Sequence, residues 1–421
     1  MPTNIPYGSD AAAKLFGVGL FTSCMQRPTT INRLTGPFPK SAEKQLRKQS
    51  TNQMPIVKTM DLTKMAGDEI TFDLVNPIGG KPIMGSAMAE GRGEDMSLST
   101  DRLRINQMRK PISAGSTMTQ QRTPHDLRAT ARALGQNYAD RYLDQLELVH
   151  MAGARGSVYD IEWTIPLESD DDFDAIVMNP VKAPSKNRHF ISTGDGIESV
   201  KVSGGEVTIA TTDLMNLDVV DAIRTWVDSV PLPPPPCYFP GDQIATDSPL
   251  RVLLVSSQQY TNIAQSPNFR TLQANAYARA AVAGNHPLFR GDVGLWNGIL
   301  VVKSPKPIRF FAGDDIKICQ DATSDTETTV KAPAALGDDY AIDRAILLGG
   351  QSLALAFGKS RQTGFPFFWS EKELDHKDKL EVLIGMIGGC SKIRFLIDHG
   401  NQTEYTDFGV AVIDTAVKII S

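Results

Sequence analysis

Two short runs, EITFDLV at Glu69–Val75 and DRLRIN at Asp101–Asn106, carry the pattern on which the fold depends. In each run apolar and polar residues alternate, and this two-residue period is typical of a β-strand with one buried face. Between them lies the stretch NPIGGKPIMGSAMAEGRGEDMS, 22 residues at 76–97 that are rich in glycine and methionine, and a connection of that length is uncommon within a compact domain. A two-stranded hairpin cannot bury its apolar face by itself. We therefore predict a projecting hairpin that packs on another subunit, with an active-site lid as the alternative.

A long helix is predicted to follow the hairpin, over residues 124–152. Thr123 is a favourable N-cap, Pro124 suits the first helical position, and Asp126 lies where the helix dipole favours an acidic side chain. Apolar residues then recur at spacings of three and four, so that one face of the helix is apolar. Gly153 is a typical helix stop. Because the span is much longer than the mean helix of about 11–12 residues, we expect a spine on which a sheet rests.

The rest of the sequence predicts an arm, shorter helices and a closing set of strands. Residues 1–52 have weak apolar periodicity, and Gln26–Ser50 carries six Lys or Arg against one Glu. This segment is either a solvated basic tail or an arm that lies across a neighbour or faces a polyanion. The sequence of residues 157–207 is poorly informative. Helices are expected at Thr212–Val230, QQYTNIAQS and RTLQANAYARAAVAG, and strands in RVLLVSS, DRAILLGGQSLALAFG, KLEVLIGMIGGCSKIRFLI and GVAVIDTAVKI.

Composition and charge indicate an ordinary soluble globular protein. The chain has 421 residues, of which 41% are apolar and 22% are charged. Its net charge of −5 argues against a protein that coats nucleic acid with a uniformly basic surface. The sequence shows no apolar run long enough for a membrane span and no secretion signal. The four cysteines are far apart and form no CxxC pair, which predicts reduced thiols in a protein made in the cytoplasm: Cys24, Cys237, Cys319 and Cys390.

One glycine-rich stretch, HPLFRGDVGLWNGILVV at His286–Val302, raises the question of a nucleotide site. A phosphate cradle places its glycines after a strand and before a helix, whose N-terminal amides bind the anion. Here the order is reversed, because the glycines lead into the strand ILVV and no GK[ST] follows. We therefore predict a structural role, in which Gly291, Gly294 and Gly298 let the backbone turn and Trp296 anchors the turn in the core.

No other pattern in the sequence indicates catalysis or metal binding. No two of the six histidines have the spacing of helical metal ligands, and neither a GxSxG elbow nor a catalytic cysteine signature is present. The acidic run ESDDDFD, Glu168–Asp174, lacks the spacing and glycine of an EF-hand loop and is typical of a solvated loop tip. We therefore expect no catalytic residues, no cofactor and no metal site. A soluble metal-dependent enzyme that uses this acidic run is the remote alternative.

The order of these parts resembles the major capsid protein of tailed bacteriophages, the shell fold shared with the herpesvirus capsid floor. The likeness is to a podovirus-type coat protein family. It is carried by the hairpin stretch Met65–Ile112, by HPLFRGDVGLWNGILVVKSP and by DRAILLGGQSLALAFG. It covers most of the chain and is vague over residues 1–50 and 157–207. The resemblance implies an α+β fold with an N-terminal arm, a hairpin called the E-loop, a peripheral P-domain that holds the spine helix, and an axial A-domain.

The resemblance also implies a division of the chain. Its E-loop tip, residues 76–97, would lie on the neighbouring subunit. Because only about 50 residues precede the hairpin, we expect a separate scaffolding protein and little or no proteolytic cleavage. The expected parts are the N-terminal arm at 1–52, the E-loop hairpin at 53–117, a P-domain at 118–207 that contains the spine helix at 124–152, an A-domain at 208–337, and closing P-domain strands at 338–421.

The function that the resemblance implies is that of a major capsid protein. Copies would form hexamers and pentamers of an icosahedral shell around the double-stranded DNA of a tailed phage, in a virion made in the host cytoplasm. The expected partners are other copies of the chain, a scaffolding protein and a portal, with a decoration protein as a further candidate, no membrane, and only non-specific contact between the arm and packaged DNA. An encapsulin-like compartment shell is the alternative. The residues predicted to make intersubunit contacts, those of the hairpin by pairing with acidic surface on a neighbour, are Arg27, Arg33, Lys40, Arg92, Arg102, Arg104, Arg109 and Lys110.

Overall fold

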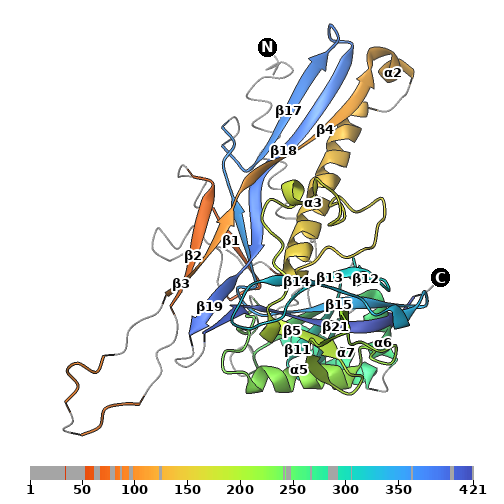
Figure 1. Cartoon of the computed structure of the whole chain (residues 1–421). Coiled ribbons are helices and arrows are strands. Elements are labelled where there is room, and N and C mark those ends of the chain that lie inside the picture. The colour runs from red at the N-terminus through yellow and green to blue at the C-terminus, as the bar shows by residue number, and fades with distance from the viewer. Residues whose placement is uncertain are drawn as a thin grey trace.

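The structure, a computed structural model, describes Leu34 and most of residues 53–419. The segments left undescribed within the longer range are 61–66, 76–80, 86–87, 94–97, 123–125, 240–241, 243–247, 266–267, 283–292, 305, 362–363 and 399–402. The described part is elongated, with a sheet along a central helix at one end, a mixed lobe at the other, and a hairpin that projects sideways (Figure 1). Of the predicted arm, only Leu34 is described, and it is fully buried in the main core.

The predicted spine is helix α3, Leu127–Ala152, which at 1.5 Å per residue is about 39 Å long. It begins later than predicted because Asp126, and not Thr123, is the N-cap. The Asp126 carboxylate accepts hydrogen bonds from two backbone N–H groups of the first turn, at 3.0 and 3.1 Å. Thr123 lies outside the described residues. The predicted stop is confirmed, because Gly153 is left-handed (φ 66°) and its N–H binds the Val149 carbonyl.

A five-stranded sheet lies along α3 (Figure 1). Helix and sheet approach closely because Gly135 of α3 has no side chain, and a Cβ there would lie 1.8 Å from Ile384. The short helix α2, Thr117–Arg122, connects the last strand before the spine to α3. The strands, in spatial order, are β1 (Ile56–Thr59), β16 (Leu353–Phe357), β18 (Lys379–Lys392) and β17 (Phe367–Leu374), with β4 (Asn106–Ser116) also paired to β18.

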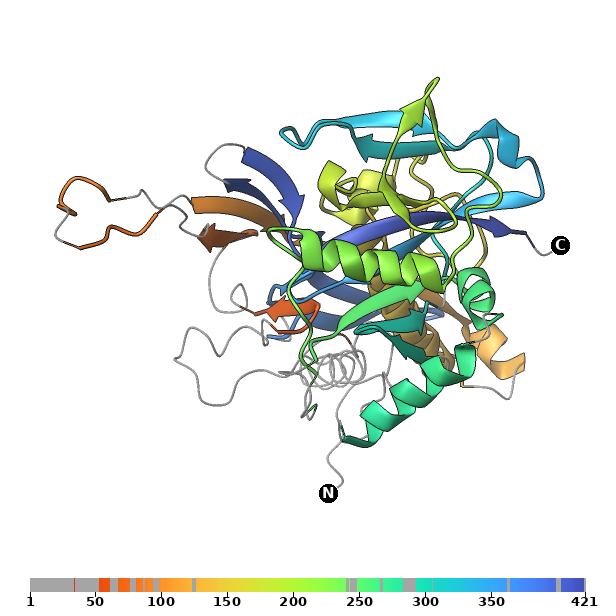
Figure 2. The ribbon, with the colours of Figure 1, turned by 90° about the horizontal axis from the view of Figure 1, so that it is seen from below.

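The predicted hairpin is confirmed as strands β2 (Glu69–Val75) and β3 (Leu98–Arg104). The two strands are antiparallel, and Glu69 lies opposite Arg104 at the root. This pair belongs to neither of the larger sheets and extends away from the body (Figures 1 and 2). The chain then passes Ile105 into β4, which pairs with β18 of the body. The hairpin is therefore attached to the molecule at its root.

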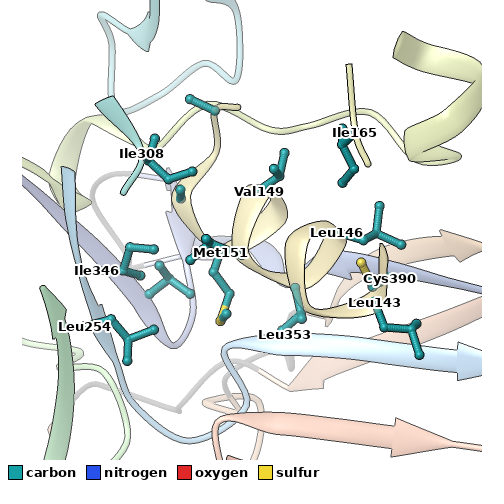
Figure 3. Close-up of a cluster of buried hydrophobic side chains, with 14 of the residues drawn as sticks. Leu143, Leu146, Val149, Met151, Ile165, Leu254, Ile308, Ile346, Leu353 and Cys390 are labelled. Carbon is teal, nitrogen blue, oxygen red and sulfur yellow. The ribbon is translucent and has the colours of Figure 1, made fainter. Parts of the chain in front are cut away.

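The lobe at the other end of the spine is built on an eight-stranded sheet with a core on both faces. Alternate residues of its central strands face opposite ways. Leu253 and Leu347 pack with one buried cluster, whereas Leu254 and Ile346 pack with the C-terminal end of α3 (Figure 3). The order is β10 (Val293–Trp296), β11 (Ile299–Lys303), β9 (Arg251–Val255), β15 (Tyr340–Leu348), β21 (Val410–Lys418), β5 (His189–Ser192) and β6 (Ile197–Ser199), with β12 (Arg309–Phe310) paired to β15.

Three helices belong to this lobe, at the places predicted. Helix α5 begins later than predicted, because Asn216 is its N-cap and accepts a hydrogen bond from the Val219 N–H at 2.9 Å. Its buried side chains contribute to the cluster on the outer face of the sheet, and Figure 2 shows it crossing that face. The helices are α5 (Leu217–Ser229), α6 (Ser257–Ala264) and α7 (Phe269–Val282).

Smaller elements complete the described part. Two 3₁₀ turns cover Lys186–Arg188 and Ala334–Leu336. The remaining elements are helix α4 (Phe173–Val177), a four-stranded sheet of β13 (Asp315–Cys319), β14 (Glu327–Lys331), β8 (Glu206–Val207) and β7 (Val202–Ser203), and a two-stranded sheet of β19 (Arg394–Asp398) and β20 (Thr403–Asp407).

The glycine-rich stretch forms the β10–β11 hairpin. Its two-residue turn has positive φ at both Asn297 (46°) and Gly298 (76°), the conformation for which Asn-Gly is the favoured pair. The Trp296 indole N–H donates to the Asp221 carboxylate of α5 at 2.9 Å. The predicted tight turn at Gly298 and the anchoring role of Trp296 are confirmed. The predicted turn at Gly294 is wrong, because this residue lies within strand β10 opposite Val301, and Gly291 lies outside the described residues.

Candidate intersubunit surface

Polar side chains fix the root of the hairpin to the body. The Asp101 carboxylate of β3 accepts hydrogen bonds from Lys182 Nζ, at 2.7 Å to each oxygen, and from the Arg394 backbone N–H at 2.9 Å. Ser99 Oγ accepts from the Leu396 N–H at 2.9 Å. Strand β3 thus lies beside β19 without joining its sheet. The direction of the hairpin is set by side chains rather than by a continuous ladder.

Asn179 holds the residue at which the hairpin leaves the body. Its Oδ1 accepts from the Arg104 N–H at 2.9 Å, and its Nδ2 donates to the Arg104 carbonyl at 2.8 Å and to the Cys390 carbonyl at 3.1 Å. The crossing beneath is tight, because a Cβ at Gly389 of β18 would lie 2.2 Å from the Arg104 oxygen. An amide that satisfies both backbone groups of one residue acts as a short substitute for a neighbouring strand.

A buried ion cluster lies directly behind this root. Asp407 pairs with Lys392 at 2.7 Å and with Arg394 at 2.8 Å. Burial alone would raise the pKa of Asp407, but Arg394 and Lys392 outweigh burial and hold that pKa well below its ordinary range. Burial lowers the pKa of Lys392 to about 8, although Asp407 opposes the shift. Because Arg394 also donates its backbone N–H to Asp101, the cluster and the hairpin root form one network.

A second buried cluster joins the spine to the lobe. Asp414 accepts hydrogen bonds from Arg344 at 2.7 and 2.9 Å and lies 2.7 Å from His189 Nε2, with all three side chains fully buried. Arg344 also donates to the Ala152 carbonyl at the end of α3, at 3.1 Å. Burial would raise the pKa of Asp414, but Arg344 and His189 hold it well below its ordinary range. The relative position of spine and lobe is therefore fixed by charge-assisted hydrogen bonds.

The predicted contact residues that the structure describes all have exposed side chains. Arg102 and Arg104 are each 73% exposed, and both reach Glu69 across the hairpin, at 3.5 and 3.7 Å. Exposed pairs of this kind contribute only about 0–1 kcal/mol to the stability of the fold. Both guanidinium groups therefore remain able to bind a second protein. Lys110 Nζ lies 5.3 Å from the centre of the Tyr138 ring. The exposed residues are Arg92, Arg102, Arg104, Arg109 and Lys110, whereas Arg27, Arg33 and Lys40 lie outside the described residues.

The acidic run is a surface turn that leads into α4. Its exposed carboxylates include Asp170, Asp171 and Asp172, and Glu168 pairs with Lys317 at 3.2 Å. Across the part of the chain that the structure describes, no group of three or more His, Cys, Asp or Glu side chains is arranged to hold a metal ion. We name Glu168–Asp174 the acidic turn and consider it as a surface for basic side chains.

Several surface features were missed by the sequence reasoning. The hairpin tip exposes Ile83, Met84 and Met88 by 38, 77 and 69%, which its methionine content could have indicated. A cavity of about 670 Å³ lies at the hairpin root, where Leu98 and Leu396 contribute to its lining. The root anchors Asp101, Asn179 and Lys182 left no signal, because their partners are distant in the sequence. Of the helices within the described ranges, none is long and apolar enough to cross a membrane.

Comparison with known proteins identifies the class. The family model described as phage capsid protein matches residues 4–419, nearly the whole chain, so the chain belongs to the phage capsid protein family. A comparison with curated proteins found no match.

Solved phage capsids share the fold. The chain is similar to the capsid of Ralstonia phage GP4, with 24% identity and a TM-score of 0.67 over 88% of this chain and 89% of that chain. It is also similar to the Cyanophage Pam1 capsid, with 18% identity and a TM-score of 0.55 over 87% and 90% of the two chains. It is similar as well to the head of Helicobacter pylori bacteriophage KHP40, with 10% identity and a TM-score of 0.53 over 86% of this chain and 87% of that chain.

These findings confirm the predicted capsid fold, a mixed fold of helices and strands. The protein is a major capsid protein of a phage virion. The family match favours neither the compartment-shell alternative nor the metal-dependent enzyme.

Proposed function

We propose that the chain forms the hexamers and pentamers of an icosahedral shell that encloses the double-stranded DNA of a tailed phage, with its hairpin lying across a neighbouring subunit. The observation that carries this proposal is the hairpin itself. It projects from the body as a two-stranded ribbon (Figure 1), and its tip exposes Ile83, Met84 and Met88. A ribbon of two strands is marginal in water, and clustered exposed apolar side chains mark interaction surfaces.

The direction of the hairpin supports a ring of subunits. In this proposal the hairpin meets a different face of the next copy, and that copy's hairpin goes on to a third copy, so the contact is heterologous. Heterologous contacts generate closed rings when the rotation between neighbours closes. The polar anchors of the root, Asp101 and Asn179, would present the hairpin to each neighbour at the same angle.

The division into parts belongs to this proposal. We assign residues 1–52 to an arm, 53–117 to the E-loop hairpin, 118–207 and 338–421 to the P-domain, and 208–337 to the A-domain. The tight packing of α3 on the five-stranded sheet supports grouping the spine with the closing strands. The eight-stranded sheet draws β5, β15 and β21 from outside 208–337, so P-domain and A-domain would share a continuous core.

The remaining partners follow from the role of a shell. A basic arm suits non-specific contact with packaged DNA, since Gln26–Ser50 carries six Lys or Arg against one Glu. A scaffolding protein would guide closure, a portal would occupy one vertex, and the chain would be made in the host cytoplasm. It would have no catalytic role.

The test is assembly of the purified chain. The chain is expressed alone and with its candidate scaffolding protein, and the soluble fraction is examined by negative-stain electron microscopy and sedimentation. Shells, tubes or ring-shaped capsomers are expected. A variant in which a two-residue Asn-Gly turn replaces residues 76–97 is expected to fold but to remain unassembled. A stable monomer of the unaltered chain in both preparations would overturn the proposal.

A further inference from the structure

The segment 177–182, here named the root clamp, carries two of the side chains that hold the hairpin. Asn179 binds both backbone groups of Arg104, at 2.9 and 2.8 Å, and Lys182 binds both carboxylate oxygens of Asp101 at 2.7 Å. Arg104 and Asp101 belong to strand β3, so a movement of this short segment would release the hairpin at two points. The question is whether the root clamp is built to move.

The root clamp begins with a strained turn. Met178 has φ 72° and ψ −49°, and the Asn179 N–H donates to the Val177 carbonyl at 2.9 Å. This is the geometry of a γ-turn with positive φ, which is rare and strained. Strain of this kind persists only where the surrounding structure holds it, and it is concentrated at sites that move or bind. The turn sets the direction of Asn179 and therefore its hold on β3.

A buried histidine lies against this turn. His150 is fully buried near the end of α3, in the part of the helix around which side chains pack on several sides (Figure 3). Neither of its ring nitrogens has a hydrogen-bond partner among the residues that the structure describes. Buried polar groups without partners are uncommon, and each calls for an explanation. The Val177 carbonyl, which already accepts from Asn179, is the backbone group that favours a proton on this ring.

Among the described residues, the charged groups that act on His150 are both cations. Lys182 comes from the root clamp and Lys392 from β18. Each lysine is already paired with a carboxylate at 2.7 Å, Lys182 with Asp101 and Lys392 with Asp407. Burial, and in smaller measure the two lysines, lower the pKa of His150 to about 4. The ring is therefore neutral at pH 7, and a proton on it is costly while the clamp is closed.

The buried carboxyl group of the spine does not offset these cations. Glu147, one turn before His150 on α3, is buried and interacts with Lys58 of β1 and with Asp144. Burial raises the pKa of Glu147 to about 8, although Lys58 opposes the shift. This carboxyl is therefore already neutral at acidic pH. A proton on His150 would add a positive charge beside two lysines and gain no negative charge from Glu147.

We propose that His150 is an acid-sensitive catch, and that a proton on its ring opens the root clamp and releases strand β3. The protonated ring competes with the Asn179 N–H for the Val177 carbonyl, which relieves the strained turn, and it repels Lys182. The hairpin then loses two of its anchors, Asn179 and Lys182, and changes its angle to the body. The inference concerns the hairpin root of a single chain, so its test does not depend on the proposed shell.

The pH range of the opening follows from the two states of the ring. The closed clamp holds the pKa of His150 at about 4, whereas an open clamp exposes the ring at its ordinary pKa of about 6.5. Because the pKa is lower in the closed state, that state is fully favoured above pH 6.5 and becomes less favoured as the pH falls toward 4. The equilibrium constant for opening is therefore expected to rise about 70-fold between pH 7.5 and pH 4.5.

The first test measures this opening by amide hydrogen exchange. The unassembled full chain is followed by mass spectrometry in peptides of β3, with rates corrected for the intrinsic exchange rate at each pH. His150→Leu cannot take a proton and is expected to keep most of the protection of β3 that the unaltered chain loses on acidification. His376→Asn, the matched control, removes an exposed histidine from the turn between β17 and β18 and is expected to respond as the unaltered chain does. An equal acid response in His150→Leu would overturn the inference.

The second test needs no variant. Exchange of the imidazole C2 hydrogen, followed by mass spectrometry in the peptide that contains His150, gives the pKa of this ring in the unaltered chain. A pKa well below 6.5 is expected, and a pKa near 6.5 would overturn the inference. A low pKa without any loss of β3 protection at pH 4.5 would also overturn it, because the ring would then be buried without controlling the hairpin root.

Discussion

Buried charges carry much of the specificity at the scale of single residues. Asp414 is paired with Arg344 and with His189, and all three side chains are fully buried. Replacing this carboxylate by an amide, in Asp414→Asn, keeps the shape but leaves the Arg344 guanidinium buried without a counter-charge. We expect the free energy of unfolding to fall by about 3–5 kcal/mol. The change is measured by unfolding the unassembled chain in guanidinium chloride while its circular dichroism is monitored.

An exposed pair supplies the control for this prediction. Asp375 and Lys379 are 3.1 Å apart, with side chains 60% and 55% exposed. Asp375→Asn removes the same charge in water and is expected to change the free energy of unfolding by less than about 1 kcal/mol. Equal losses in the two variants would show that burial of the Arg344–Asp414 pair is not what stabilises the junction of spine and lobe.

Sequence reasoning at this scale succeeds where the cause is local. Gly153 could be predicted as a helix stop because a left-handed residue is needed at the chain position that follows the helix. The sequence offers both Thr123 and Asp126 as N-cap residues, since both residue types can cap, and only the folded backbone decides in favour of Asp126. Asp101 carries no local signal as an anchor, because its partners Lys182 and Arg394 come from distant parts of the chain.

At the scale of elements, glycines decide how closely segments approach. Gly389 in β18 lies beneath the hairpin root, and a Cβ there would lie 2.2 Å from the Arg104 oxygen and 3.1 Å from Asn179 Nδ2. Gly389→Ala must therefore push the root away from β18 and disturb the Asn179 hydrogen bonds. We expect a loss of about 1–3 kcal/mol in unfolding free energy and faster amide hydrogen exchange in β2 and β3.

The matched substitution is Gly196→Ala. The nearest atoms to a Cβ at Gly196 are 3.8 Å away, an ordinary contact, so stability and exchange are expected to stay near those of the unaltered chain. Unchanged exchange in the hairpin of Gly389→Ala would mean that the crossing at Arg104 does not position the hairpin.

Elements with a strong period were predictable, and those held by distant contacts were not. The hairpin strands and the spine follow from spacings of two and of three to four. Residues 157–207 gave no period, because much of this segment is fixed by single side chains such as Arg155 and Gln145 rather than by a repeating apolar face. For the same reason the conformation of residues 158–164 could not be predicted from the sequence.

At the scale of the whole molecule, the order of strands joins segments that are far apart in the chain. Strand β1 pairs in parallel with β16, with Ile56 opposite Leu353, and β21 lies between β15 and β5. No local pattern specifies such neighbours. The architecture could be anticipated from the resemblance in the order of parts, and the pairing itself needed the structure.

The last prediction concerns exposed charges of the hairpin that are expected to pair between subunits. The arginines of the hairpin, Arg102 and Arg104, already reach Glu69 within the chain, at 3.5 and 3.7 Å, yet remain largely in water. We expect the double variant Arg102→Glu, Arg104→Glu to remain folded, since exposed pairs contribute about 0–1 kcal/mol, and to assemble poorly because like charges would then face each other between subunits. Sedimentation velocity at low and high salt measures both properties.

A charge swap distinguishes pairing between subunits from a loss of solubility. Adding Asp170→Lys and Asp171→Lys to the double variant restores opposite charges between hairpin and acidic turn, so assembly is expected to recover although neither surface is native. The recovery should weaken as salt rises, because exposed charges are screened within about 8–10 Å near physiological ionic strength. If particle yield is unchanged by reversing Arg102 and Arg104, the pairing is unnecessary for assembly. If it falls and the swap does not restore it, the arginines face some surface other than the acidic turn.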